Sequence, residues 1–170
     1  MKLEDITLKL PVRKEGITAF FESCEKRKKF ISVNSEEYSK HLKKAKHDLS
    51  RAINEYKDRC FDWTIIKAYY AIHHAANALL LRTKGIICKD HSCLIIALKH
   101  YEIISEEFFK EISQIHEALS DVLGLDLTFQ LRKIGQYSVE EWEKLTDEDA
   151  QLVLTIAKKI VSFVEHDKTH

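Results

Sequence analysis

The sequence contains few residues that interrupt helices. Its 170 residues include only four glycines and one proline, Pro11. Glycine and proline are the strongest local breaks in helical patterns, so long uninterrupted helices are expected. Apolar residues make up 45% of the chain, which is enough for one hydrophobic core in a domain of this length. The composition therefore predicts a single-domain, all-α protein.

The chain also lacks a net charge, because 27 basic residues balance 27 acidic ones. Overall charge therefore predicts no particular partner. The distribution is uneven: residues 1–60 carry 15 basic and 10 acidic side chains, with basic runs at 26–29 and 40–46. These runs are typical of a solvated helix face, and a surface for an anionic ligand is the alternative interpretation.

The four cysteines form no CxxC pair, with Cys88 and Cys93 the only close spacing, and the histidines show no metal-ligand spacing. The cysteines are Cys24, Cys60, Cys88 and Cys93, without a CxxC motif. Met1 to Val12 alternates charged and apolar residues, unlike a secretory leader. We therefore expect a cytoplasmic protein with reduced thiols and no disulfide. We also expect no bound metal and no cofactor.

One run, residues 62–81, is apolar on nearly every side of a helix and is long enough to raise the question of a membrane span. Lys67, His73, His74 and Asn77 lie inside it and would be costly in lipid, so no membrane association is expected. A helix of this kind belongs at the centre of a bundle. Lys67, His74 and Asn77 form a polar stripe along it, which needs partners in either a dimer interface or a small polar cleft.

Helix start and stop signals divide the rest of the chain. Asn34 with Glu37 predicts a helix over 35–59, and Asp62 and Gly85 should begin and end the central one. Further helices are expected after Asp90, after Ser105, and after the Thr146 and Asp149 pair, with shorter pieces at 17–30 and 125–134. No strand is expected beyond the first dozen residues. These elements predict an up-and-down helical bundle of four to five helices over 34–167, with an N-terminal extension at 1–33.

The residues from Asp62 onward also resemble a known family. Asp62-Trp63 opens a helix that reads AYYAIHHAANALL, a glycine turn follows, and His91-Ser92 opens the next helix. This arrangement resembles the HEPN domain family, and in particular its small stand-alone members from archaea and bacteria. The resemblance implies a homodimer that acts in a toxin–antitoxin or defence system, often with a nucleotidyltransferase partner.

Several members of that family are metal-independent ribonucleases in which an arginine is followed a few residues later by a histidine. The arginine holds the scissile phosphate and the histidine moves the proton of the attacking hydroxyl. The matching arginine here is Arg132, but Tyr137 stands where the histidine is expected. Tyrosine, with an ordinary pKa of about 10, is a poor base at neutral pH.

The resemblance therefore implies that Arg132, Lys133 and Tyr137 bind RNA or a nucleotide. The first alternative is an active metal-independent endoribonuclease with Arg132 and Tyr137 as catalytic residues, or with a displaced histidine such as His116 as the base. The second alternative is a non-catalytic dimerisation module. In some pairs of this family the nucleotidyltransferase adenylates a tyrosine near the motif, and Tyr137 lies close to that position.

Overall fold

The computed structural model describes residues 8–122 and 145–166 of the chain. The prediction of an all-α protein is confirmed, because helices dominate the described residues and the two strands are short. In chain order the elements are α1 (Lys14–Lys26), β1 (Phe30–Ser32), α2 (Glu37–Lys57), α3 (Phe61–Lys84), β2 (Ile86–Cys88), α4 (His91–His100), α5 (Glu106–Val122) and α7 (Asp147–His166). The helix predicted at 125–134 lies outside the described residues.

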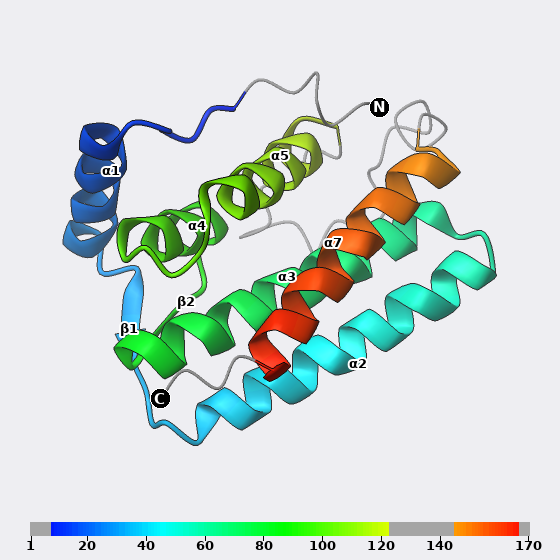
Figure 1. Ribbon diagram of the computed structural model, residues 1–170, viewed down its shortest axis with the longest axis horizontal. Coiled ribbons are helices and arrows are strands. Elements are labelled where there is room, and N and C mark those ends of the chain that lie inside the picture. The colour runs from blue at the N-terminus through cyan, green and yellow to red at the C-terminus, as the bar shows by residue number, and fades with distance from the viewer. Residues whose placement is uncertain (1–7, 123–144, 167–170) are drawn as a thin grey trace.

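Helix α3 runs through the centre of the bundle. Helices α2 and α7 lie along it, and α4 and α5 pack on the other side (Figure 1). Small residues on α3, among them Ala68, Ala75 and Ala78, are fully buried, as are Ala45 and Ala52 on α2. Because these side chains are short, the two long helices can approach each other closely. The uniformly apolar sequence of α3 thus places it at the centre, as predicted.

Several helix ends use the residues that the sequence indicated. The Asp90 carboxylate accepts a hydrogen bond from the Cys93 N–H at 3.1 Å, which caps α4. Gly85 follows α3 with a left-handed φ of 70°. Thr146 and Asp149 form a reciprocal capping box, with the Asp149 N–H donating to Thr146 Oγ1 at 3.2 Å and the Thr146 N–H to Asp149 Oδ2 at 3.0 Å.

Two predicted helix starts are displaced. Helix α3 begins at Phe61 with Cys60 at the N-cap, so Asp62 lies in the first turn instead of capping it. There its carboxylate is next to the positive end of the helix dipole. The Asn34 side chain accepts a hydrogen bond from the Glu36 N–H in the preceding turn, and α2 starts at Glu37. Both signals marked the correct region but not the correct residue.

The expectation of no strand after the first dozen residues is wrong. Strands β1 and β2 pair antiparallel, with Phe30 opposite Cys88. Three residues are too few for an alternating pattern to show in the sequence. The Asn77 side chain holds β2 against α3, because it donates to the Cys88 carbonyl at 3.0 Å and accepts from the Cys88 N–H at 2.7 Å.

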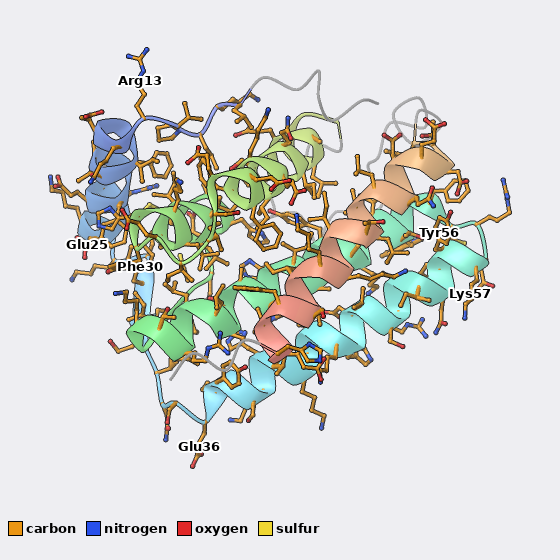
Figure 2. The ribbon with its side chains drawn as sticks, viewed as in Figure 1. Arg13, Glu25, Phe30, Glu36, Tyr56 and Lys57 are labelled. Atoms are coloured by element: carbon orange, nitrogen blue, oxygen red, sulfur yellow. A yellow bond between two sulfur atoms is a disulfide. The ribbon has the colours of Figure 1, made fainter. Side chains whose placement is uncertain are left out.

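The expectation of no disulfide is also wrong. Cys24 on α1 and Cys93 on α4 form a disulfide with a Cα–Cα separation of 5.9 Å. They are 69 residues apart in sequence, so no local spacing could indicate the pair. Helix α1 packs against α4 at one end of the bundle (Figure 1), and Arg13 at its start points away from the protein (Figure 2).

Within residues 8–122 and 145–166, no helix has the length and apolar character that crossing a membrane requires.

Candidate functional site

The clearest concentration of polar chemistry in the described part of the chain is a buried tyrosine–histidine network between α3, α4 and α5. The Tyr69 hydroxyl lies 2.9 Å from His91 Nδ1 and 2.8 Å from His116 Nδ1. The other nitrogen of His116, Nε2, lies 2.9 Å from Ser92 Oγ. One continuous hydrogen-bonded chain therefore runs from His91 through Tyr69 and His116 to the partly exposed Ser92.

Helix geometry brings these side chains together from three elements. Tyr69 and His73 are four residues apart on α3, so they lie on the same face, which is turned toward α4. His91 and Ser92 are the first two residues of α4, and His116 belongs to the buried face of α5. Tyr69, His91 and His116 are 2%, 7% and 9% exposed, so their hydrogen bonds are shielded from water.

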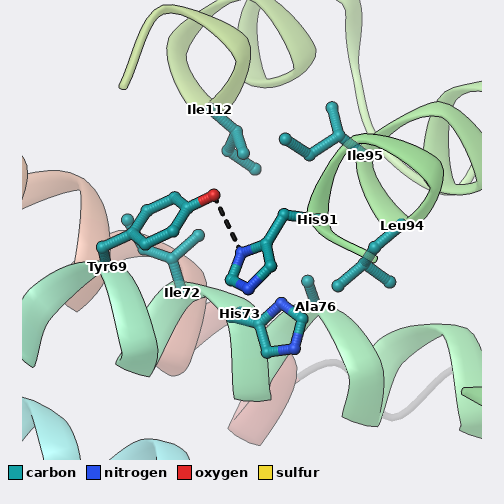
Figure 3. A pocket seen from close by; sticks show the side chains of 8 residues that line it. All are labelled: Tyr69, Ile72, His73, Ala76, His91, Leu94, Ile95 and Ile112. Carbon is teal, nitrogen blue, oxygen red and sulfur yellow. Dashed lines mark hydrogen bonds between the residues drawn. The ribbon is translucent and has the colours of Figure 1, made fainter. Parts of the chain in front are cut away.

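The network is packed and leaves no room for a sizeable ligand. The His91 ring stacks on His73 with the ring centroids 3.9 Å apart (Figure 3). The cavity beside the two rings has a volume of only about 10 Å³, room for about one water molecule. Its remaining lining is mostly aliphatic: Ile72, Ala76, Leu94, Ile95 and Ile112.

Burial controls the protonation of the network. Loss of solvent, reinforced in His91 by neighbouring His116, lowers the pKa of both histidines to about 4. Burial likewise lowers the pKa of His73 well below its usual value and raises that of Tyr69. At neutral pH all four groups are uncharged. The Tyr69 hydroxyl has one hydrogen, so it donates to one of its two histidines and accepts from the other.

A second polar cluster connects α2 and α3. Asp48 on α2 is 2% exposed and forms an ion pair with Lys44. Its Oδ2 atom lies 3.9 Å from Nε2 of His74 on α3, and His74 Nδ1 lies 3.3 Å from His41 Nδ1. Burial lowers the pKa of His74 to about 4, with Asp48 acting in the opposite direction.

The predicted polar stripe on α3 therefore finds its partners inside the same chain. His74 contacts the residues of α2, Asn77 binds the backbone of β2, and the Lys67 ammonium lies 5.7 Å from the centroid of the Trp63 ring. These polar side chains therefore need neither a dimer interface nor an open cleft to find interaction partners. His73 and His74 diverge to different neighbours, as their adjacent positions on a helix require. In the described ranges no group of three or more potential ligands could hold a metal ion.

The residues predicted to bind a ligand are not among those that the structure describes. Arg132, Lys133 and Tyr137 fall outside the described residues, so their roles stay predictions. The sequence indicated His91 as part of a helix start and His116 as a candidate base, but did not indicate that Tyr69 joins them. The available signal was partial: Tyr69 and His73 share one face of a helix that is otherwise apolar.

The fold and the buried network define a helical-bundle protein with an N-terminal helix attached to one end. Residues 38–167 match the sequence model of the HEPN domain, and the chain belongs to the HEPN domain family. The resemblance found in the sequence is thereby confirmed. Comparisons with curated proteins and with solved structures find no match.

Proposed function

We propose that this HEPN-family protein is a homodimer that binds RNA or a nucleotide through Arg132, Lys133 and Tyr137. It acts in a toxin–antitoxin or defence system together with a nucleotidyltransferase. The observation that carries this proposal is the family match over 38–167, which includes the Arg132–Tyr137 segment. Arg132 binds a phosphate with two parallel hydrogen bonds, Lys133 adds positive charge, and Tyr137 hydrogen-bonds to the nucleotide or stacks on it.

The buried network supports this choice of residues indirectly. Its histidines are uncharged at neutral pH and their cavity admits no more than about a water molecule, so they do not form a phosphate site. Arg132 and Lys133 would supply permanent positive charge, which favours the binding of an anionic ligand.

Fluorescence anisotropy with labelled single-stranded RNA and with a labelled nucleotide tests the proposal. Replacing Arg132 by alanine should weaken binding by about 1.5–3 kcal/mol, the range for a hydrogen bond to a charged group. The matched control is Arg13→Ala, which removes an exposed arginine that points away from the bundle. Equal affinities of the wild type and of Arg132→Ala would refute the proposal.

One observation favours the alternative of an active endoribonuclease. His116 is uncharged and bonded to Ser92, whose side chain is partly exposed, so this pair connects the buried network to the surface, although a pKa of about 4 makes His116 a weak base at neutral pH. An RNA cleavage assay in excess chelator separates the two functions. Cleavage by the wild type, with loss of cleavage in both Arg132→Ala and His116→Gln, would establish the endoribonuclease. Binding without cleavage favours the first proposal.

The proposed homodimer has a candidate interface on α7. Leu152 and Phe163 are 40% and 43% exposed. They are eleven residues apart, about three helical turns, so they share one outward face of the helix. A symmetric dimer would bring the same face of both copies together. If α7 mediates pairing but no RNA or nucleotide binds, the third possibility, a dimerisation module without a ligand, holds instead.

A further inference from the structure

The disulfide between Cys24 and Cys93 is close to the surface although both cysteines are fully buried. Both residues are 0% exposed. One Nη atom of Arg27 lies 3.5 Å from each of the two sulfurs, and Arg27 itself is exposed. A long, solvated side chain therefore covers the disulfide. We expect rotation of this exposed side chain to open a path from solvent to the two sulfurs.

The surroundings stabilise a negative charge on Cys93. Cys93 is in the first turn of α4, where the helix dipole favours an anion, and the Arg27 guanidinium adds a positive charge. The Asp90 carboxylate opposes this effect, but Lys29 neutralises it with an ion pair of 3.1 Å. A thiol that ionises easily is a good leaving group in disulfide exchange. Cys93 is thus the sulfur that departs.

The two remaining cysteines do not compete for the bond. Burial raises the pKa of the Cys88 thiol to about 12, so it stays protonated and is not a nucleophile. Cys60 precedes α3 and Cys88 follows it, so Cys60 is about one helix length from this region. Internal rearrangement of the disulfide is therefore disfavoured, and exchange requires a thiol from outside.

From this geometry we propose that Cys24–Cys93 is a thiol–disulfide exchange site, through which a dithiol reductant of the thioredoxin class detaches α1 from α4. A thiolate of the reductant attacks the Cys24 sulfur, the disulfide breaks, and Cys93 leaves as a thiolate. The second thiol of the reductant then attacks the mixed disulfide and releases Cys24. Two electrons and two protons pass to the protein, and the reductant becomes a disulfide.

Detachment is feasible because α1 packs chiefly against a single element, α4. Its buried side chains are Ile17, Phe21 and Cys24, and Phe21 stacks on His100 with centroids 4.1 Å apart. Residues 1–37, which include α1, precede the segment that matches the HEPN domain. Reduction would therefore free an appended helix while the family bundle stays folded. Disulfides in the cytoplasm are usually of this reversible kind.

The test measures reduction of the folded, full-length protein by dithiothreitol at neutral pH, with rapid alkylation and mass spectrometry to count thiols at each cysteine. We expect Cys24 and Cys93 to become alkylated while the helical circular dichroism falls by no more than the contribution of α1. Arg27→Gln should slow reduction severalfold, because it removes the positive charge that favours departure of the Cys93 sulfur. Lys26→Gln removes an adjacent exposed cation and should have no such effect.

Hydrogen exchange identifies what the disulfide holds in place. In the reduced protein and in a Cys24→Ser, Cys93→Ser variant, the amides of α1 should exchange much faster, and those of α3 should not. A disulfide that resists dithiothreitol until the whole protein unfolds would overturn the proposal and indicate a permanent structural link. Unchanged protection of α1 after reduction would overturn it as well, as would equal reduction rates for Arg27→Gln and Lys26→Gln.

Discussion

The buried histidines should make the protein sensitive to mild acid. His91 and His116 titrate near pH 4 when folded, whereas an unfolded chain titrates them near 6.5. Because the folded pKa is the lower one, the unfolded state binds more protons as the pH falls. The contribution of these histidines to the free energy of unfolding is therefore fully present above about pH 6.5. It is lost progressively as the pH falls from about 6.5 to about 4.

The size of the effect follows from the two pKa values. At about pH 5, each histidine lowers the free energy of unfolding by about 2 kcal/mol, or about 4 kcal/mol for the pair. For a chain of this length that corresponds to a fall of about 10 °C in Tm. The Tyr69 hydroxyl couples the two sites, because two imidazolium N–H groups cannot both donate to it without leaving its own hydrogen unpaired.

Urea unfolding at a series of pH values from 7.5 to 5 measures this dependence. His91→Asn keeps a hydrogen-bonding atom near Nδ1 but cannot titrate, so the slope of the free energy against pH should fall by about 1.4 kcal/mol per pH unit. His166→Gln changes an exposed histidine and should leave the slope unaltered. A wild-type stability that is flat between pH 6.5 and 5, or equal slopes in wild type and His91→Asn, would refute the reasoning.

Three further predictions concern single contacts. Thr146→Ala should cost about 1 kcal/mol by removing the capping box of α7, measured by thermal unfolding, while Thr155→Ala on the exposed face of α7 should change little. Asn77→Ala should cost about 2–3 kcal/mol, because it leaves the buried Cys88 N–H without an acceptor. Phe163→Glu should reduce the mass in light scattering from about twice the 19.9 kDa of one chain to that of a monomer, and Val12→Glu, at a similarly exposed position, should not.

Most of the fold was predictable because helices are specified by neighbouring residues. The start of α4 at Asp90, the end of α3 at Gly85 and the capping box at Thr146 each depend on contacts within a few positions. The apolar sequence of α3 also predicted correctly that this helix lies at the centre of the bundle. Local hydrogen bonds and hydrophobic periodicity leave clear patterns in a sequence.

The candidate site was less predictable because its members meet only in the folded chain. Tyr69 and His116 are 47 residues apart, and Cys24 and Cys93 are 69 apart. Neither pair has a spacing that indicates contact. The absence of a CxxC motif argued against a disulfide, yet bundle packing brought two distant cysteines to bonding distance. The short strands were missed for a similar reason, since their pairing partner lies more than fifty residues away.

The first turn of α4 is the element at which these long-range contacts converge. Its four consecutive residues each engage a different partner: Asp90 pairs with Lys29, His91 with Tyr69, Ser92 with His116, and Cys93 with Cys24. Three of those partners are on α1, α3 and α5, and the fourth immediately precedes β1. Any displacement of this turn must therefore change the disulfide region and the buried network together. Reduction at Cys93 and protonation at His91 would act on two residues of a single turn, separated only by Ser92, so we expect the covalent state of α1 to influence the charge state of the bundle interior.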